Sequence, residues 1–259
     1  MIMMCRGTKT FISIENLTLG YGGDVVVENL NFNINTGDIF VIMGLSGCGK
    51  STIMRSIVGL NAPMHGRIIV NDKDIWTMSL GERGRIIETF GVSYQSGALF
   101  SSMTLGENVA LPMEMKTTMS HFEIEKEVRK KMELVGLGGY ENVYPTDASG
   151  GMIKRAALAR ALALNPRALF FDEPSAGLDP VRSKQLDNLI VEINKKLGTT
   201  IVMVTHDLAS IMTIATNSVY IGNKTVRAYG PPRQILQTTK NPEIIEFLTR
   251  EIKNKRGKK

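Results

Sequence analysis

The sequence predicts an α/β fold in which a helical segment interrupts a mainly parallel sheet. Three observations predict it: a wholly apolar run leads into a glycine-rich loop and a helical pattern, the middle third lacks β-branched runs, and strand and helix patterns alternate afterwards. The chain has 259 residues, of which 43% are hydrophobic and 22% are charged. These ordinary values exclude a disordered, collagen-like or coiled-coil chain.

The first third of the chain contains three strand-like runs. Residues 11–19 alternate between apolar and polar positions up to Gly20, and residues 31–35 form a second run. Residues 39–43 are apolar throughout, which is typical of a strand buried on both faces. A helical pattern follows the glycine-rich loop and extends through Gly59.

The middle third, residues 106–164, is expected to be helical, most clearly over residues 121–135. The apolar positions that recur there at helical spacing are Phe122, Val128, Met132 and Val135. The later strands are expected over residues 168–171, 201–204, 218–221 and 225–228, and the later helices over residues 181–197, 207–214 and 241–251.

The charge of the chain is concentrated at its C-terminal end. The formal net charge is +6, and residues 250–259 supply five of these charges because they hold six basic side chains and one acid. The nearly neutral remainder gives no argument for a nucleic-acid-binding body, and no nucleic-acid partner is expected. The basic segment is expected either to bind anionic lipid headgroups or to be a solvated end.

We expect no membrane span and no secretory signal. No apolar run approaches the roughly 18 residues that a span needs, and the apolar start is too short for a signal. The two cysteines, Cys5 and Cys48, cannot form a disulfide framework, which indicates a reduced, cytosolic setting.

A glycine-rich loop lies between the apolar run and the first helical pattern. It consists of Gly44, Leu45, Ser46, Gly47, Cys48, Gly49, Lys50, Ser51 and Thr52. It satisfies the pattern G-x-x-x-x-G-K-S/T in the strand-to-helix setting that this motif requires. Glycines let successive N–H groups turn toward phosphate oxygens, and the helix start adds its positive end. The loop therefore predicts nucleotide binding, with Lys50 on the β- and γ-phosphates and the Ser51 hydroxyl on Mg²⁺.

Two carboxylates, Asp172 and Glu173, follow an apolar run that predicts a buried strand. Open α/β sheets bind ligands at the carboxyl ends of their strands. Asp172 is expected to hold Mg²⁺ through water, and Glu173 to polarise the water that attacks the γ-phosphate. Alone, the pair is also compatible with solvated acids at a strand end.

Ser149, Gly150 and Gly151 precede an alanine-rich helical stretch. Ser149 is expected to be an N-cap, and the two glycines leave the first N–H groups of the helix uncovered, which suits an anion. An ordinary capped helix explains the same residues, so both interpretations remain open.

In their order and spacing, these motifs resemble those of the ATP-binding subunits of ABC transporters. The resemblance covers about residues 11–238. It implies a P-loop NTPase (RecA-like) core with a mainly parallel sheet, an N-terminal antiparallel β subdomain and a helical insert at about residues 97–165. A leader at residues 1–10 and a C-terminal helix and basic tail at residues 239–259 complete the expected organisation. It also implies an ATPase that uses ATP and Mg²⁺.

The segment from Ser149 to Gly151 resembles the family's signature loop, with Ala148 and Met152 in place of the usual leucine and glutamine. In the family this loop closes over the γ-phosphate of ATP that the partner subunit holds. The resemblance therefore implies a head-to-tail dimer of two copies with ATP between them.

Four further positions match the family one by one. Tyr21 resembles the aromatic residue that stacks on adenine, and Gln95 resembles the glutamine that contacts Mg²⁺ and the attacking water. His206 resembles the switch histidine on the γ-phosphate. Asp179, at the end of residues 175–179, belongs to a segment that resembles the loop communicating across the dimer.

Residues 43–47 and 95–100, together with Met152, resemble the branch of ABC ATPases that serves Mla/Mce-type phospholipid transporters. This implies an integral membrane permease and an MCE-type lipid-binding protein as partners, with a small regulatory subunit as a further candidate. It places the chain as a peripheral subunit on the cytoplasmic face of the inner membrane. An ATPase for lipoprotein release or amino-acid import remains the alternative.

Residues 101–115 are expected to line the cleft that receives a short helix of the permease. Their apolar side chains serve that cleft or pack the helical insert, and packing is the favoured role of each one; they are Leu105, Val109, Leu111 and Met113.

Overall fold

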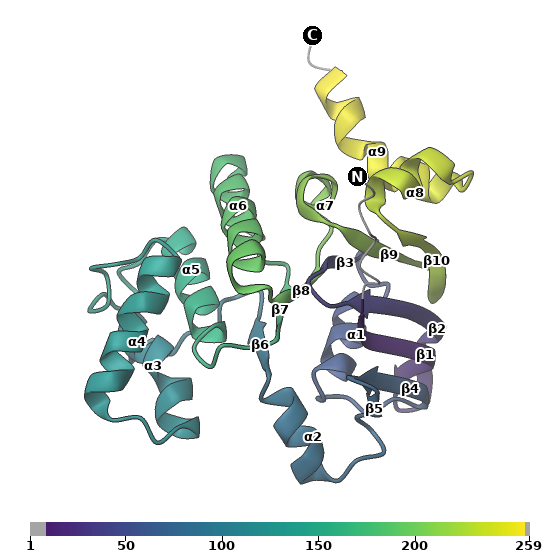
Figure 1. The fold of residues 1–259 in the computed structure, drawn as a ribbon. Helices are drawn as coiled ribbons and strands as arrows, with labels where there is room; N and C mark the ends of the chain where they lie inside the picture. The colour runs from purple at the N-terminus through teal and green to yellow at the C-terminus, as the bar shows by residue number, and fades with distance from the viewer. Residues whose placement is uncertain (1–8, 257–259) are drawn as a thin grey trace, which may run out of the picture. The chain divides into compact units, whose positions relative to one another are not determined.

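The computed structural model describes residues 9–256, with side-chain surroundings through residue 249. The predictions for the apolar start, for Cys5 and for the basic side chains of residues 250–259 lie outside that description. The chain forms two compact units, one of Met1–Ile87 with Ala215–Lys259 and one of Glu88–Ile214 (Figure 1). Among the described residues, no helix combines the length and the apolar character needed to cross a membrane.

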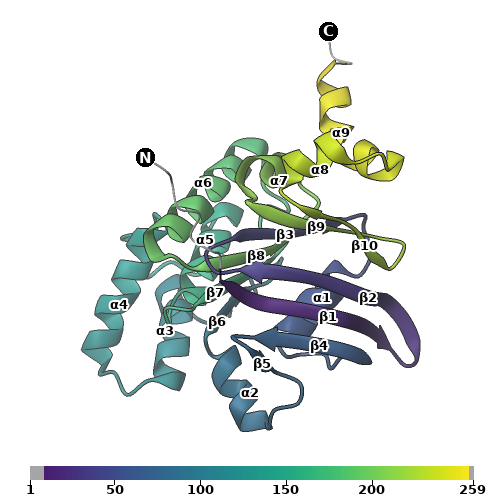
Figure 2. The same ribbon diagram turned by 45° about the vertical axis from the view of Figure 1, so that its right-hand side comes forward.

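The first unit contains a four-stranded antiparallel sheet in the order β2-β1-β4-β5 (Figure 2). These strands are β1 (Thr10–Tyr21), β2 (Asp24–Asn35), β4 (His65–Val70) and β5 (Lys73–Asp74). The alternation along β1 buries one face of the sheet, where Ile12 is fully buried and lies opposite both Ile34 and Val70. The strands β4 and β5 were not predicted, because β4 has a run of only three apolar residues and β5 has none.

The other strands of this unit are β3 (Ile39–Gly44), β9 (Asn217–Gly222) and β10 (Thr225–Gly230). β3 and β9 are parallel, and β10 pairs antiparallel with β9. Every residue of β3 is buried, which confirms the prediction from its apolar run. The helix α1 (Lys50–Ile57) follows β3 and packs against β1 and β3.

Three more helices belong to the first unit: α2 (Leu80–Ile87), α8 (Pro232–Thr238) and α9 (Pro242–Arg256). α2 was not predicted, and it buries no residue. α9 was predicted over residues 241–251, and it buries Ile244 and Leu248.

The second unit is built on three parallel strands, in which β7 lies between β6 and β8. The strands are β6 (Phe90–Ser93), β7 (Ala168–Asp172) and β8 (Thr200–Val204). All residues of β7 and β8 are buried. The helix α6 (Pro180–Leu197) follows β7, and α7 (Leu208–Ile214) follows β8 and packs against α6.

Three helices fill the middle third of the chain, as predicted: α3 (Leu105–Lys116), α4 (His121–Leu134) and α5 (Gly150–Ala161). They pack against one another. Three of the apolar residues of α3 are 0–1% exposed, which supports the packing role predicted for them; they are Leu105, Val109 and Met113.

The prediction for the buried face of α4 was wrong at one position. Phe122 is 75% exposed, whereas Ile124, Val128 and Met132 are buried. Helical spacing from Val128 and Met132 leads back to Ile124, so Phe122 lies off the buried face.

Candidate functional site

The predicted phosphate loop connects β3 to α1 in the first unit. Gly44, Gly47 and Gly49 have positive φ angles of 151°, 80° and 96°, a region that favours glycine. A Cβ atom added to Gly44 would lie 2.4 Å from the carbonyl oxygen of Ile221, and one added to Gly49 would lie 2.6 Å from Cγ1 of Val27. Backbone conformation and close packing therefore both require glycine in this loop.

Lys50 is held within the same loop. Its side chain is buried, and its Nζ donates hydrogen bonds to the carbonyl oxygens of Gly44, at 3.0 Å, and Leu45, at 2.9 Å. α1 begins with Gly49 as an N-cap that offers no side-chain hydrogen bond, and its first turn contains no acidic residue. The N–H groups of a first helical turn have no partner within the helix. The ammonium and the positive helix end thus gather at one loop, which fits a phosphate anion.

Two other predicted residues of the first unit have distinct surroundings. Burial raises the pKa of the Cys48 thiol, so it stays neutral and inert near pH 7. Tyr21 is 50% exposed, and its hydroxyl accepts a hydrogen bond of 2.7 Å from Nδ2 of Asn61. Its ring therefore offers an exposed aromatic face, as stacking on a base requires.

The second unit brings Glu173 and His206 into contact. Nδ1 of His206 lies 2.7 Å from Oε1 of Glu173, and the Thr205 hydroxyl donates to Oε2 at 3.1 Å. The backbone N–H of Glu173 donates to the carbonyl oxygen of Val204 at 2.8 Å. Both carboxylate oxygens of the predicted base are therefore oriented, and sequence reasoning did not identify Thr205 as a partner.

Asp172 ends β7 and is 9% exposed. Among the described residues, no group of three or more His, Cys, Asp and Glu side chains could hold a metal ion. Mg²⁺ needs no such cluster, because it is bound through one or two protein oxygens together with water and substrate phosphates. The carboxylate of Asp172, the hydroxyl of Ser51 and the amide of Gln95 have the oxygen chemistry that Mg²⁺ prefers.

Gln95 follows β6 in a loop that α5 holds from one side. Its carbonyl oxygen accepts a hydrogen bond from Nζ of Lys154. The guanidinium of Arg160 donates to the carbonyl oxygens of Gly97 and Ala98, both at 2.8 Å. Sequence reasoning missed both basic residues, although each is a cation on the helix that starts at Ser149.

The Glu173 carboxylate also affects the pKa of Lys154. Burial lowers the pKa of Lys154, and the Glu173 carboxylate opposes that change. A cation thus faces the predicted base without an ion pair within bonding distance.

Ser149 is the N-cap of α5, as predicted, and its Oγ accepts a hydrogen bond of 3.3 Å from the backbone N–H of Met152. A Cβ added to Gly150 would meet no atom within 4 Å, and one added to Gly151 would meet only side-chain atoms of Arg182 and Ser149, at 3.8 Å or more. The start of α5 is therefore open.

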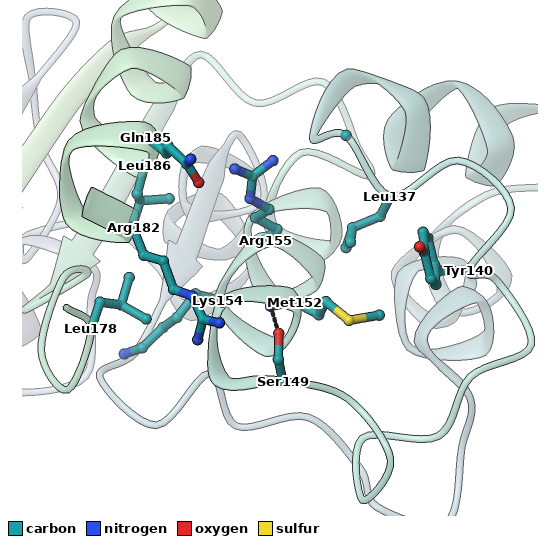
Figure 3. Close-up of a pocket in the computed structure, with 12 residues that line it drawn as sticks. Leu137, Tyr140, Ser149, Met152, Lys154, Arg155, Leu178, Arg182, Gln185 and Leu186 are labelled. Carbon is teal, nitrogen blue, oxygen red and sulfur yellow. Dashed lines mark hydrogen bonds between the residues drawn. The ribbon is translucent and has the colours of Figure 1, made fainter. Parts of the chain in front are cut away.

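A pocket of about 230 Å³ lies beside this helix start. Figure 3 shows Ser149 with its hydrogen bond to Met152, and the basic side chains of Lys154, Arg155 and Arg182 around the same pocket. The lining is suited to an anionic ligand.

Asp179 caps α6. Its Oδ1 accepts hydrogen bonds from the N–H groups of Val181 and Arg182, both at 3.0 Å, and its Oδ2 lies 3.3 Å from Nε of Arg182. The N–H of Arg182 is the main cause that lowers the pKa of this exposed carboxyl. The observed role is a helix cap within the chain, and the predicted role toward nucleotide stays a prediction.

A family model described as ABC transporter matches residues 27–176. The chain is 40% identical over 237 residues to a probable ribonucleotide transport ATP-binding protein, mkl, of Mycobacterium leprae, covering 92% of this chain and 68% of that protein. It is 37% identical over 243 residues to MlaF, the intermembrane phospholipid transport system ATP-binding protein of Haemophilus influenzae, covering 94% and 92%.

Solved structures support the same fold. The ATP-binding cassette MJ0796, in a dimeric post-hydrolysis state bound to ADP and Pi, matches with a TM-score of 0.75 and 29% identity, over 84% of this chain and 97% of that one. CbiO1 of Clostridium perfringens, part of the transporter complex CbiONQ, matches with a TM-score of 0.82 and 28% identity, over 95% and 97%.

These matches confirm the α/β fold class and its resemblance to ABC ATPases. They also confirm the prediction of an ATP-hydrolysing enzyme. The glycine-rich loop holds its buried lysine and the Glu173–His206 pair is oriented, and the roles of these residues in that reaction stay predictions. The chain therefore belongs to the ABC transporter family, as an ATP-binding subunit.

Proposed function

We propose that this chain hydrolyses ATP to power phospholipid transport through a membrane permease and an MCE-type lipid-binding partner. The observation that carries the proposal is the end-to-end match to two MlaF proteins named for phospholipid transport, which the chain covers over 91–92% of their length at 36–37% identity. Residues 95–100 and Met152, which resemble this branch of the family, support it.

A second cargo comes from the mkl relatives, which are named for ribonucleotide transport. They are 40–41% identical to this chain, but the chain spans only 66–68% of their length. Ribonucleotide is therefore the competing substrate.

In the proposed binding step, the phosphate loop and Lys50 hold the triphosphate. The Lys50 ammonium is already placed by two loop carbonyls, so little order has to be gained when phosphate oxygens arrive. Tyr21 stacks on the adenine, with half of its surface exposed for that contact.

In the proposed hydrolytic step, Glu173 accepts a proton from the attacking water. Its contacts with Thr205 and His206 orient the carboxylate before substrate binds. His206 contacts the γ-phosphate, and Gln95 orients the water. Ser51, Gln95 and Asp172 would hold Mg²⁺, which would supply positive charge to the phosphate oxygens.

Two copies act together in this proposal, and two solved relatives are dimeric. The open start of α5, with Ser149 to Gly151, binds the γ-phosphate of ATP held by the second copy, and Asp179 lies at the same interface. ATP stabilises the closed pair because it binds that state preferentially, and hydrolysis removes the preference. We place the pair as a peripheral component on the cytoplasmic face of the inner membrane.

Reconstitution with the permease and MCE-type protein of the same organism tests the function. We expect ATP-dependent transfer of a fluorescent phospholipid between liposomes, and loss of transfer with Lys50→Ala because that variant binds ATP weakly. Lys224→Ala, at an exposed turn of the same unit, is the matched control. Uptake of labelled ribonucleotide in place of lipid, or failure to purify with the permease, would overturn the proposal.

A further inference from the structure

A buried cluster of carboxylates and hydroxyls joins α6 and α7 to the two loops that carry Glu173 and His206. The hydroxyl of Ser210 lies 2.9 and 2.8 Å from the two carboxylate oxygens of Asp187 and 3.2 Å from Oδ2 of Asp207. Asp187 is 5% exposed and Ser210 is 1% exposed. The proposed mechanism assigns no role to this cluster.

Asp207 holds the segment that follows Glu173. Its Oδ2 accepts hydrogen bonds of 3.2 Å from the hydroxyls of Ser175 and Ser183. Its own N–H donates to Oγ1 of Thr205, whose hydroxyl donates to Glu173. Asp207 therefore links the loop after β7, where Ser175 lies two positions after Glu173, to the loop after β8, where Asp207 itself follows His206.

The cluster holds fewer protons than acceptor oxygens. The Ser210 hydroxyl has one proton to donate, and three carboxylate oxygens lie within its reach. When Asp187 is ionised, it accepts the hydrogen bond from Ser210, and Oδ2 of Asp207 accepts hydrogen bonds from Ser175 and Ser183 alone. When Asp187 is protonated, it donates to Ser210, which then donates to Asp207 and competes with Ser175.

The burial of Asp187 makes this exchange accessible near neutral pH. Burial raises the pKa of Asp187 to about 6, the hydrogen bond from Ser210 opposes the rise, and the charge of Asp207 adds to it. Neither α7 nor β8 contains a titratable residue. The neighbouring cations on α6, Arg182 and Lys184, are exposed.

We propose that Asp187 is a positioning residue for ATP hydrolysis, acting through Ser210 and Asp207 on the Ser175 loop. The ionised form keeps Ser175 bonded to Asp207 and thereby keeps Glu173 and His206 in their hydrolytic arrangement. The protonated form weakens that bond. This inference rests on the proposed role of Glu173 in hydrolysis.

Asp187→Asn is the decisive variant, because its amide donates to Ser210 and so mimics the protonated form at every pH. We expect kcat for ATP hydrolysis at about pH 8 to fall about fivefold, the effect of one hydrogen bond, with KM for ATP unchanged. At about pH 5.5 wild type and variant should converge. The two proteins differ at Asp187 alone, so the ratio of their rates at each pH isolates that residue.

Glu192→Gln is the matched control, since Glu192 lies on the same helix in an exposed pair with Lys196. It should leave kcat unchanged. Ser210→Ala removes the bridge between Asp187 and Asp207. In that background, the ratio of the rates with and without Asp187→Asn should not depend on pH. With Ser210 present, a ratio that is constant with pH, or equal to one throughout, would overturn the proposal.

Amide hydrogen exchange gives a readout without catalysis. The N–H of Ala176 donates to Glu173 and that of Leu178 donates to Ser175. At about pH 8, both amides should exchange faster in Asp187→Asn than in wild type, and unchanged exchange would refute the inference. If wild type did not hydrolyse ATP but the two amides still exchanged faster in the variant, the proposed function would be contradicted and the link from Asp187 to the Ser175 loop would stand.

Discussion

Glu173 is constrained in both its backbone and its side chain. Its φ of 49° lies in the left-handed region, which costs a non-glycine residue about 1–3 kcal/mol. The hydrogen bond to Val204 and the contacts with Thr205 and His206 hold it there. This local strain accompanies a carboxylate that is aimed before substrate binds.

Glu173→Gln tests its role as the base. Glutamine preserves the size of the side chain but cannot accept a proton, so turnover should fall by about 10²–10⁴-fold while ATP affinity is retained. Phosphate release and equilibrium nucleotide binding measure the two effects. The exposed Glu125→Gln on α4 serves as control, and near-normal phosphate release by Glu173→Gln would refute the assignment.

The raised pKa of Asp187 also predicts how stability depends on pH. Its pKa of about 6, against an ordinary 3.8, means that the folded state binds a proton more tightly than the unfolded chain. Its contribution to stability is therefore present below about pH 4 and is lost as pH rises through about 6, a difference of about 3 kcal/mol.

Asp187→Asn should not lose stability as the pH rises through about 6, because its side chain does not ionise. The free energy of unfolding of the variant, minus that of wild type, should increase between about pH 5 and pH 8. Urea unfolding at both pH values measures it, with Glu192→Gln as reference. A difference that stays constant with pH would contradict the raised pKa.

At the scale of elements, α5 connects two segments of the second unit for which functional roles are predicted. Its first residues form the open start that is predicted to bind an anion, and its Lys154 and Arg160 hold the loop after β6 that carries Gln95. Because one helix bears both sets of contacts, we expect a displacement at its start to be transmitted to the Gln95 loop.

Arg160→Lys tests this connection. One ammonium cannot bridge the carbonyls of Gly97 and Ala98 in the planar manner of a guanidinium. We expect the free energy of unfolding to fall by about 1–2 kcal/mol. The amides of residues 95–100 should also exchange faster. Arg129→Lys, at an exposed pair on α4, is the matched control. Equal unfolding free energies and equal exchange rates in the two variants would show that Arg160 does not hold the Gln95 loop.

At the scale of the whole molecule, the proposed pairing of two copies depends on the open start of α5. An aspartate at Gly151 fits the fold, since the nearest atoms to its Cβ belong to flexible side chains and an acid in a first helical turn is favourable. It would, however, place a negative charge where the γ-phosphate of the second copy's ATP is proposed to bind.

Gly151→Asp should therefore abolish ATP-dependent dimerisation in the Glu173→Gln background while leaving thermal stability and ATP binding unchanged. Sedimentation with and without ATP measures the pairing. Gly84→Asp, at an equally open position on α2, should still dimerise. Dimerisation of Gly151→Asp at the wild-type ATP concentration would contradict the proposed interface.

The sequence alone determined the features whose cause is local. The fully buried β3, the glycine-rich loop and the Ser149 cap depend on residues that are adjacent or one helical turn apart, so their patterns could be interpreted directly. The helices of the middle third followed from apolar spacing, although the buried face of α4 excludes Phe122. The proposed domain boundaries stay predictions.

Only the tertiary structure decided which distant side chains meet. Glu173 and His206 are 33 positions apart, Arg160 and Gly97 are 63 apart, and Ser210 and Asp187 are 23 apart. Apolar periodicity specifies which face of an element is buried, but not which polar groups of other elements lie against it. Those partners are set when the strands and helices pack, because each buried polar group must then find a hydrogen bond.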